Sequence, residues 1–172
     1  SSRGPVSPFY FKPDLVAPGV FVNTTSVNNY YNITSGTSYA APHVSGAVAL
    51  LLNKNPEFSP EQIKSILVTT SDVIADEYGQ KFDFNTGGAG RLNVTSAFKS
   101  EVIFSPPNLT FDLSSQKNSQ VKKIQIESIN QEIYELDVEF TKSEYVKFEQ
   151  ELVGNGLQIN AELTTDEILE LE

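Results

Sequence analysis

Residues 36–46 read Gly-Thr-Ser-Tyr-Ala-Ala-Pro-His-Val-Ser-Gly, and the first half of the chain is best understood outward from this stretch. Between Thr37 and Asn53 the apolar residues recur at the three- and four-residue spacing of an α-helix: Ala40, Val44, Ala47, Val48 and Leu51. Many side chains here are small, which lets a helix approach neighbouring backbone closely. The pattern therefore predicts a central, buried helix that begins near Ser38.

Two interpretations of Ser38 follow from its place at the start of this helix. The first N–H groups of a helix lack intrahelical acceptors and create positive potential, so a developing oxyanion beside Ser38 can accept from its N–H. Gly36 would let backbone or substrate come close. In the other interpretation Ser38 only caps the helix. The spacing alone favours the cap, because serine is common at that position.

Weaker local signals flank this helix. Turn residues break the segment from Leu15 to Val22 into short strand pieces. Ser59, Pro60 and Gln62 form a capping box with proline at the first helical position, which predicts a second helix. Further on we expect a tight glycine loop over 87–90 and a short helix over about 95–99.

The hydrophobic period changes from helical to alternating after Pro106-Pro107. Apolar and polar residues alternate over 108–113, 123–127, 134–140 and 157–163. Such alternation is typical of strands with one buried and one solvated face. Four or five strands joined by polar turns predict an all-β sandwich over residues 101–172. The sandwich is expected to be incomplete, because about seven strands are usual.

Composition bounds the function. The chain has 172 residues, of which 39% are hydrophobic, with one His and no Cys, so disulfides, thiol nucleophiles and sites built on two imidazoles are excluded. The net charge of −10 argues against nucleic-acid binding. Residues 1–100 carry seven charges of each sign, whereas residues 101–172 carry five basic and fifteen acidic ones, which indicates two domains divided at that point. No apolar run is long enough for a membrane span.

Residues 36–46 resemble the nucleophile motif of subtilisin-like serine proteases, the subtilases. Four further segments resemble the same family in the same order: residues 2–5 (Ser-Arg-Gly-Pro), 12–19 (Lys-Pro-Asp-Leu-Val-Ala-Pro-Gly), 59–70 (the second helix) and 88–93 (Gly-Ala-Gly-Arg-Leu-Asn). The resemblance covers most of residues 1–100. It implies that they are the C-terminal part of a subtilase catalytic domain, an α/β fold with a parallel sheet and helices.

The resemblance also implies an activity. Ser38 would be the nucleophile of a serine endopeptidase that cleaves polypeptide substrates through an acyl-enzyme. In this family the catalytic Asp and His precede the serine, so both should lie upstream of Ser2. We therefore expect the isolated chain to be inactive. Its expected partner is the upstream half of the catalytic domain, in the same precursor or as a second chain. The alternative is a non-catalytic extracellular scaffold or binding module derived from a subtilase.

A triad of Asp14, His43 and Ser38 within this chain is rejected. His43 follows Ser38 by five residues on one helix, about 140° around the axis, so the two side chains cannot meet. In the family pattern His43 and Asp14 belong to structural segments. We predict packing roles for both.

Residues 101–172 resemble, by position and by the opening Pro106-Pro107-Asn108-Leu109-Thr110-Phe111, the fibronectin type III-like domain of pyrolysin-like, lactocepin-like and cucumisin-like subtilases. No cofactor is evident. Ca²⁺ is possible in the full enzyme, although the acids Asp72, Asp76, Glu77 and Asp83 lack the spacing of a calcium loop. Four Asn-x-Ser/Thr patterns, at Asn23, Asn32, Asn93 and Asn108, favour an exported protein, either secreted or at the cell surface.

Overall fold

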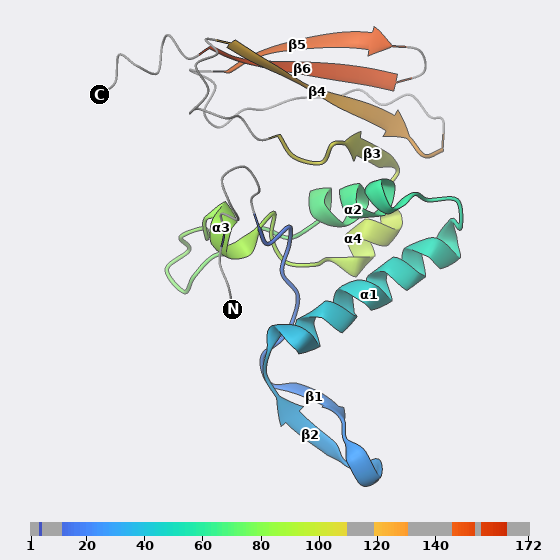
Figure 1. Ribbon diagram of the computed structural model, residues 1–172, viewed down its shortest axis with the longest axis vertical. Helices are drawn as coiled ribbons and strands as arrows, with labels where there is room; N and C mark the ends of the chain where they lie inside the picture. Colours follow the sequence, from blue (N-terminus) through green and yellow to red (C-terminus); the bar gives the residue numbers. More distant parts are fainter. Residues whose placement is uncertain (1–3, 5–11, 110–118, 131–145, 154–155, 165–172) are drawn as a thin grey trace. The chain divides into compact units, whose positions relative to one another are not determined.

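The computed structural model describes residue 4 and residues 12–109, 119–130, 146–153 and 156–164. The chain divides into two compact units, Ser1–Ser100 and Glu101–Glu172, and each is described here by itself. The described residues form a mixed α/β structure with small antiparallel sheets (Figure 1).

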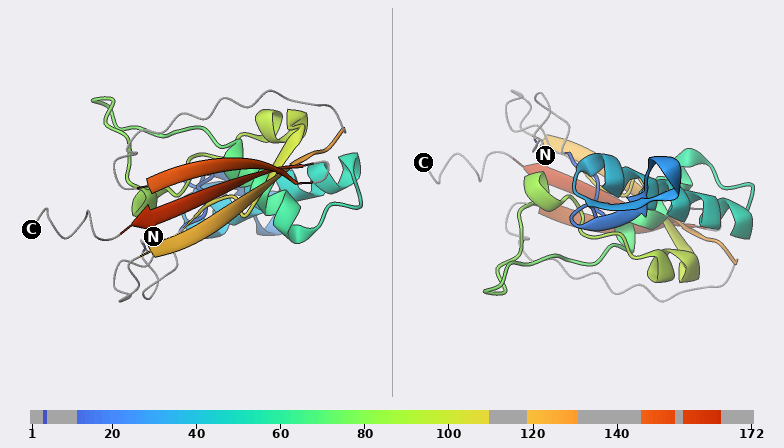
Figure 2. Two further views of the ribbon diagram at one scale, coloured as in Figure 1. Left: turned by 90° about the horizontal axis from the view of Figure 1, so that it is seen from above. Right: turned by 90° about the horizontal axis from the view of Figure 1, so that it is seen from below.

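A β-hairpin opens the first unit and leads into its longest helix (Figures 1 and 2). Strand β1 (Val22–Thr25) pairs antiparallel with β2 (Tyr31–Thr34), and a single 3-10 turn, η1 (Val27–Asn29), joins them. Asn28 and Asn29 hold φ values of 58° and 62° there. Asparagine tolerates this left-handed conformation, so the Asn-Asn pair allows the chain to reverse. The sequence reasoning did not predict this hairpin.

The helix predicted from Thr37 is confirmed as α1 (Thr37–Lys54). Its predicted burial is confirmed only in part, since Ala47 and Leu51 are the buried hydrophobic residues that α1 contributes within the described part of the chain. Leu50 remains 51% exposed and Leu52 38% exposed. The apolar spacing thus located the helix correctly, while much of its surface is left uncovered by the described residues.

The second predicted helix is α2 (Pro60–Thr69), and its capping box is confirmed. The Gln62 N–H donates to Ser59 Oγ at 3.2 Å, and the Ser59 N–H donates back to Gln62 Oε1 at 2.9 Å. The short helix α4 (Val94–Lys99) contacts both α1 and α2. Together the three helices bury the core of this unit, which includes these side chains: Ala47, Leu51, Ile63, Ile66, Leu67, Val68 and Ala97.

The glycine loop that was predicted over 87–90 begins at the end of α3 (Phe84–Gly87) and brings three distant segments together. Arg91 pairs in parallel with Val16 and antiparallel with Asp72. Gly90 adopts φ +136°, and a Cβ atom there would lie 2.1 Å from the Asp72 carbonyl oxygen. Only glycine lets the backbone at this position pass so close to the backbone of Asp72. Among the described residues, the Val16–Arg91 bridge is the only parallel pairing. The larger parallel sheet that the resemblance implies therefore stays a prediction.

The second unit contains one four-stranded antiparallel sheet in the order β3-β4-β6-β5 (Figures 1 and 2). The strands are β3 (Val102–Ser105), β4 (Ser119–Ser128), β5 (Val146–Val153) and β6 (Gly156–Thr164). Alternation had predicted the strands at 123–127 and 157–163, whereas β3 and β5 were missed. The alternating stretches at 108–113 and 134–140 lie largely outside the described residues. A second sheet, which a sandwich requires, is not seen in the described part, so the fibronectin-like sandwich also stays a prediction.

Candidate active site

Ser38 is the second residue of α1 and is exposed to solvent. The helix opens at Gly36, whose carbonyl oxygen accepts the first bond, from the Tyr39 N–H, at 3.0 Å. Among the described residues, none accepts a hydrogen bond from the Ser38 N–H. Ser38 therefore presents a hydroxyl group and a free amide at the positive end of an 18-residue helix.

Ser38 does not cap this helix, so the simpler interpretation of the residue is wrong. The N-cap position is taken by Gly36, and no side chain caps the helix. Serine stabilises a helix end chiefly through an oxygen that accepts from the backbone two or three residues later. Ser38 already lies inside the helix, so its hydroxyl is left available for another role.

Two hydrogen bonds fix the approach to Ser38. The Gly36 N–H donates to the Gly19 carbonyl oxygen at 2.7 Å, and the Phe21 N–H donates to Ser35 Oγ at 2.9 Å. A Cβ atom on Gly19 would lie 2.9 Å from the Gly36 carbonyl oxygen, so the contact requires glycine. The Ala-Pro-Gly segment thereby positions the beginning of the helix.

Phe21 was not singled out by sequence reasoning, although its backbone is unusual. It holds φ 53°, which is rare for a bulky side chain, and the residue is 80% exposed. The hydrogen bond to Ser35 compensates part of that conformational cost. No sequence signal distinguishes this phenylalanine from those that pack in ordinary strands.

The structure confirms that Asp14, His43 and Ser38 do not form a triad. The His43 ring nitrogen Nδ1 lies 2.8 Å from the carbonyl oxygen of Tyr39, one turn earlier in the same helix. Asp14 is bound to Lys12 and, at 2.8 Å, to Lys64 of α2. Asp14 thus holds two segments of the unit together, whereas His43 is exposed among the described residues, so a packing role for His43 stays a prediction.

The charges around Asp14 determine how it titrates. Partial burial by itself would raise the pKa of Asp14, but hydrogen bonds and attraction from Lys12 and Lys64 outweigh it. The pKa therefore lies below its ordinary value of 3.8, and Asp14 is a carboxylate at neutral pH. Its function is to tie the segment before Ala17 to helix α2.

Three of the four scattered acidic residues also have structural partners. Asp72 Oδ1 accepts from Asn93 at 2.8 Å, and this bond, together with that from Arg91, lowers the pKa of Asp72. Asp76 Oδ1 accepts two backbone N–H groups of its own loop, and Asp83 caps α3. In the part of the chain that the structure describes, no group of three or more His, Asp or Glu side chains converges as a metal site would require.

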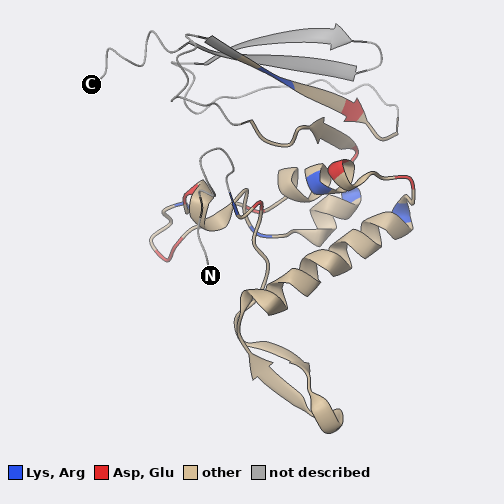
Figure 3. Ribbon diagram, viewed as in Figure 1, with Lys and Arg blue, Asp and Glu red and all other residues tan. Residues whose placement is uncertain are grey.

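The stretch of chain that leads into Ser38 and continues through most of α1 has no acidic residue, lysine or arginine (Figure 3). Between Asp14 and Lys54 the sequence contains no Lys, Arg, Asp or Glu. Several large hydrophobic side chains of this stretch are nevertheless at least two-thirds exposed: Val20, Phe21, Val27, Tyr30, Tyr31 and Ile33. Among the described helices, none is long and apolar enough to cross a membrane.

Comparison of the sequence with known proteins identifies the family of this chain. Residues 1–100 match the model of the subtilase family, peptidase family S8. The chain is 32% identical over 155 residues to the minor extracellular protease Vpr of Bacillus subtilis (strain 168), an alignment that covers 83% of this chain and 19% of that protein. It is 36% identical over 138 residues to subtilisin-like protease SBT1.6 of Arabidopsis thaliana, covering 67% of this chain and 17% of that protein.

A third relative, subtilisin-like protease SBT3.10 of Arabidopsis thaliana, is 40% identical over 123 residues, covering 60% of this chain and 16% of that protein. The chain thus spans less than a fifth of the length of these curated relatives. The family match covers more than half of the chain and contains the helix start with Ser38. This chain belongs to the subtilase family of serine proteases.

Proposed function

We propose that residues 1–100 are the C-terminal part of the catalytic domain of a serine endopeptidase and that Ser38 is its nucleophile. The observation that carries this proposal is the exposure of Ser38, with an unpaired N–H, in the first turn of α1. Membership in the subtilase family supports it, since the family's proteases act through a serine in this motif.

In the proposed reaction Ser38 Oγ attacks the carbonyl carbon of a peptide bond while a His takes the hydroxyl proton. The Ser38 N–H donates to the oxyanion that forms, and the amine leaves with the proton that the His returns. Water then hydrolyses the acyl-enzyme ester and regenerates the hydroxyl group. The His and its orienting Asp would come from the upstream half of the domain, in the same precursor or as a second chain.

The remaining expectations are part of the same proposal. Extended polypeptides are the proposed substrates, and Ca²⁺ remains possible as a stabilising ion of the full enzyme. The relative Vpr is described as an extracellular protease, which supports secretion or display at the cell surface for this protein too. Residues 101–172 are proposed to belong to a fibronectin type III-like domain.

The alternative is a non-catalytic extracellular scaffold or binding module derived from a subtilase. It is favoured by the roles of Asp14 and His43, because the described residues offer Ser38 no general base. A scaffold would retain the fold of residues 1–100 and leave Ser38 chemically inert.

Labelling with a fluorophosphonate probe distinguishes the two. The native protein is treated with the probe, digested and mapped by mass spectrometry. A protease should carry one adduct at Ser38 and lose it in the Ser38→Ala variant. The Ser45→Ala variant is a matched control, because Ser45 is exposed on the same helix and its Oγ donates to the Ala41 carbonyl oxygen. Folded native protein without an adduct would overturn the proposal in favour of the scaffold.

A further inference from the structure

One face of the β1–β2 hairpin carries apolar side chains that the described residues leave uncovered. The register pairs Asn23 with Ile33 and Thr25 with Tyr31. Residues directly opposite each other in an antiparallel pair point to the same side, so these four residues share one face, which we call the Tyr31 face. All four are exposed, and Tyr31 and Ile33 are 69% and 70% exposed. The apolar part of the Tyr31 face therefore meets solvent directly.

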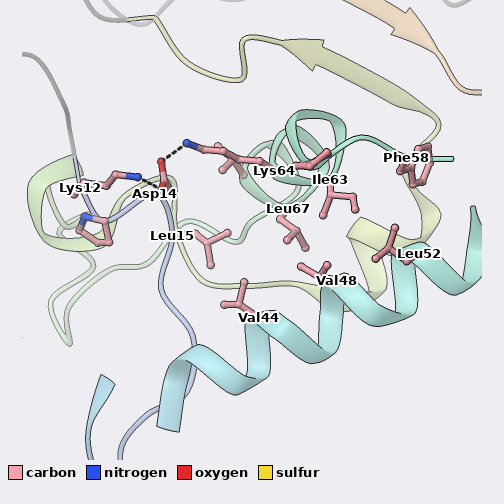
Figure 4. A pocket seen from close by; sticks show the side chains of 13 residues that line it. Lys12, Asp14, Leu15, Val44, Val48, Leu52, Phe58, Ile63, Lys64 and Leu67 are labelled. Carbon is pink, nitrogen blue, oxygen red and sulfur yellow. Dashed lines mark hydrogen bonds and ion pairs between the residues drawn. The ribbon is translucent and has the colours of Figure 1, made fainter. Parts of the chain in front are cut away.

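Other apolar side chains of this unit are arranged differently. Val44 and Val48 of α1 and Ile63 of α2 line a common apolar groove, with the ion pair of Asp14 and Lys64 at its rim (Figure 4). No residue of the hairpin is among those that line this groove. The hairpin also lies within the stretch that contains no Lys, Arg, Asp or Glu, so it has no charge of its own to keep the Tyr31 face soluble. An exposed apolar face of this kind is expected to be covered in the native protein.

Two of the glycosylation acceptor patterns lie on this hairpin. Asn23-Thr24-Thr25 is part of β1, and Asn32-Ile33-Thr34 is part of β2. Both asparagines are exposed. Asn32 pairs with Thr24, so it stands on the opposite face of the hairpin from Asn23. The hairpin thus offers one acceptor amide on each face, and the acceptor on the Tyr31 face is the direct cross-strand partner of Ile33.

We propose that Asn23 and Asn32 carry N-linked glycans and that the glycan on Asn23 covers Tyr31 and Ile33. The donor is a lipid-linked oligosaccharide diphosphate. A bond forms between the asparagine Nδ2 atom and the anomeric carbon of the first sugar, the lipid diphosphate leaves, and the amide gives up one proton. Cβ atoms of directly opposed residues lie about 4.5–5.5 Å apart, so the first sugar on Asn23 stands beside Ile33. Tyr31 is the diagonal neighbour and lies within reach of the next sugar.

The hydrogen bonds of the asparagines allow this modification on the hairpin. Asn32 Nδ2 donates to Ser26 Oγ at 3.0 Å. A primary amide has two N–H groups and glycosylation uses one, so Asn32 keeps a donor for Ser26. Asn93, in another acceptor pattern, is half-buried, donates to Asp72 at 2.8 Å and accepts from the Ser96 N–H at 2.9 Å. Its amide is held between two partners, which makes Asn93 the internal comparison.

The chemistry of the Tyr31 face favours a glycan as its cover. Asn23 has no side-chain partner among the described residues, and it is itself a member of the face. A sugar is uncharged, as the hairpin is, and it turns C–H groups toward apolar side chains while its hydroxyl groups stay in water. Tyr31 has a matching apolar ring and polar tip. The inference rests on the export that the proposed function includes, and it does not depend on the activity of Ser38.

Glycopeptide mass spectrometry of the native protein, purified from the organism that makes it, tests the modification. The peptides that hold Asn23 and Asn32 should carry sugar in most molecules, and the peptide that holds Asn93 should be unmodified. Asn23→Gln and Asn32→Gln, made in the same organism, should each remove one glycan and leave the other. A native protein without sugar at Asn23 or at Asn32 would overturn the proposal.

Fluorescence of anilinonaphthalene sulfonate, a dye that binds exposed apolar surface, tests the cover. Asn23→Gln removes the glycan beside Tyr31 and Ile33, so dye fluorescence should rise. Asn32→Gln is the matched control, because it removes a glycan from the other face, and equal rises in the two variants would overturn the proposal. Adding Tyr31→Thr and Ile33→Thr to Asn23→Gln should abolish the rise. A rise that persists in this triple variant would come from other surface and would also overturn it.

The two proposals fail separately in these experiments. Glycans on both asparagines of a protein that the fluorophosphonate probe does not label would remove the nucleophile and keep the glycan cover. Labelled Ser38 in a protein without sugar on the hairpin would do the reverse.

Discussion

The Gly36 N–H donates a 2.7 Å hydrogen bond to the carbonyl oxygen of Gly19, and this bond joins the Ala-Pro-Gly segment to the helix that carries Ser38. The two backbones come this close because Gly19 has no side chain. A Cβ on Gly19 would lie 2.9 Å from the Gly36 carbonyl oxygen and 3.1 Å from Ala40 Cβ. The resemblance between separate motifs thus corresponds to a physical contact between them.

The first prediction concerns this contact. Gly19→Ala should lower the free energy of unfolding by about 1–3 kcal/mol, because the helix start must move to accept the methyl group. Urea denaturation of the 172-residue chain measures the change. Gly46→Ala is the matched control, since a Cβ at Gly46 meets no described atom within 4 Å. That substitution should stabilise α1 by about 0.5–1 kcal/mol. Equal effects of the two substitutions would contradict the close approach at Gly19.

A second prediction follows from the capping box of α2. Ser59→Ala removes the oxygen that accepts from the Gln62 N–H and should cost about 1 kcal/mol of stability. Ser59→Asp keeps an acceptor at the helix start and should restore most of that loss. Chemical denaturation of the three proteins provides the comparison. An alanine variant as stable as the original would show that the cap contributes nothing here.

The third prediction concerns acid stability. The pKa of Asp14 is below 3.8 in the folded chain, so its ionised form stabilises folding at neutral pH. Because the folded pKa is the lower one, this contribution is complete above about pH 4 and is lost as the pH falls through the folded value. Asp14→Asn should therefore be less stable than the original protein at pH 7, with the difference disappearing at lower pH. Unfolding curves measured between pH 7 and pH 2 test this, and a difference that grows on acidification would refute it.

Lys64 supplies the internal control for that experiment. Asp14→Asn and Lys64→Gln each break the same ion pair. At pH 7 the double variant Asp14→Asn/Lys64→Gln should therefore lose less free energy of unfolding than the sum of the losses in the two single variants. Strictly additive effects of the two substitutions would mean that the pair seen in the structure does not stabilise the fold.

The fourth prediction separates the glycosylation patterns by structure. Asn23 is exposed on β1 with no side-chain partner among the described residues, whereas Asn93 caps α4 and donates to Asp72. When the chain is expressed in a eukaryotic secretory host, Asn23 should carry glycan and Asn93 should not. Mass spectrometry before and after enzymatic deglycosylation measures both sites. Substantial occupancy of Asn93 would mean that modification precedes folding of this region.

Local signals in the sequence predicted the helices well. The apolar spacing after Thr37 and the Ser59 capping box each depend on residues within a turn or two. The first signal located both ends of α1 to within about one residue, and the second located the start of α2. The family motifs directed attention to Ser38, which composition alone would have left as a possible cap. Its assignment as the nucleophile stays a prediction.

Long-range pairings were the part that local patterns could not supply. Strand β3 is the short run Val102–Ser105, which has no alternating period of its own, and it pairs with β4 rather than with the alternating stretch that follows it in the sequence. The hairpin before Ser38 had a usable signal in its Asn28-Asn29 turn, flanked by strand-forming residues. The contact of Asp72 with Asn93 and Arg91 depends on the whole unit folding, so no spacing rule anticipates it.

The bridge between Val16 and Arg91 has a consequence for the order of events during synthesis. The segment that leads toward Ser38 is held by residues near the far end of the same unit. The two partners of this bridge are therefore far apart in the sequence. The N-terminal residues are synthesised first, so the bonds of Val16 to Gly90 and Leu92 cannot form until those two residues have left the ribosome. The helix that carries Ser38 can form early, but its entrance is locked last, which delays assembly of the site until nearly the whole unit has been translated.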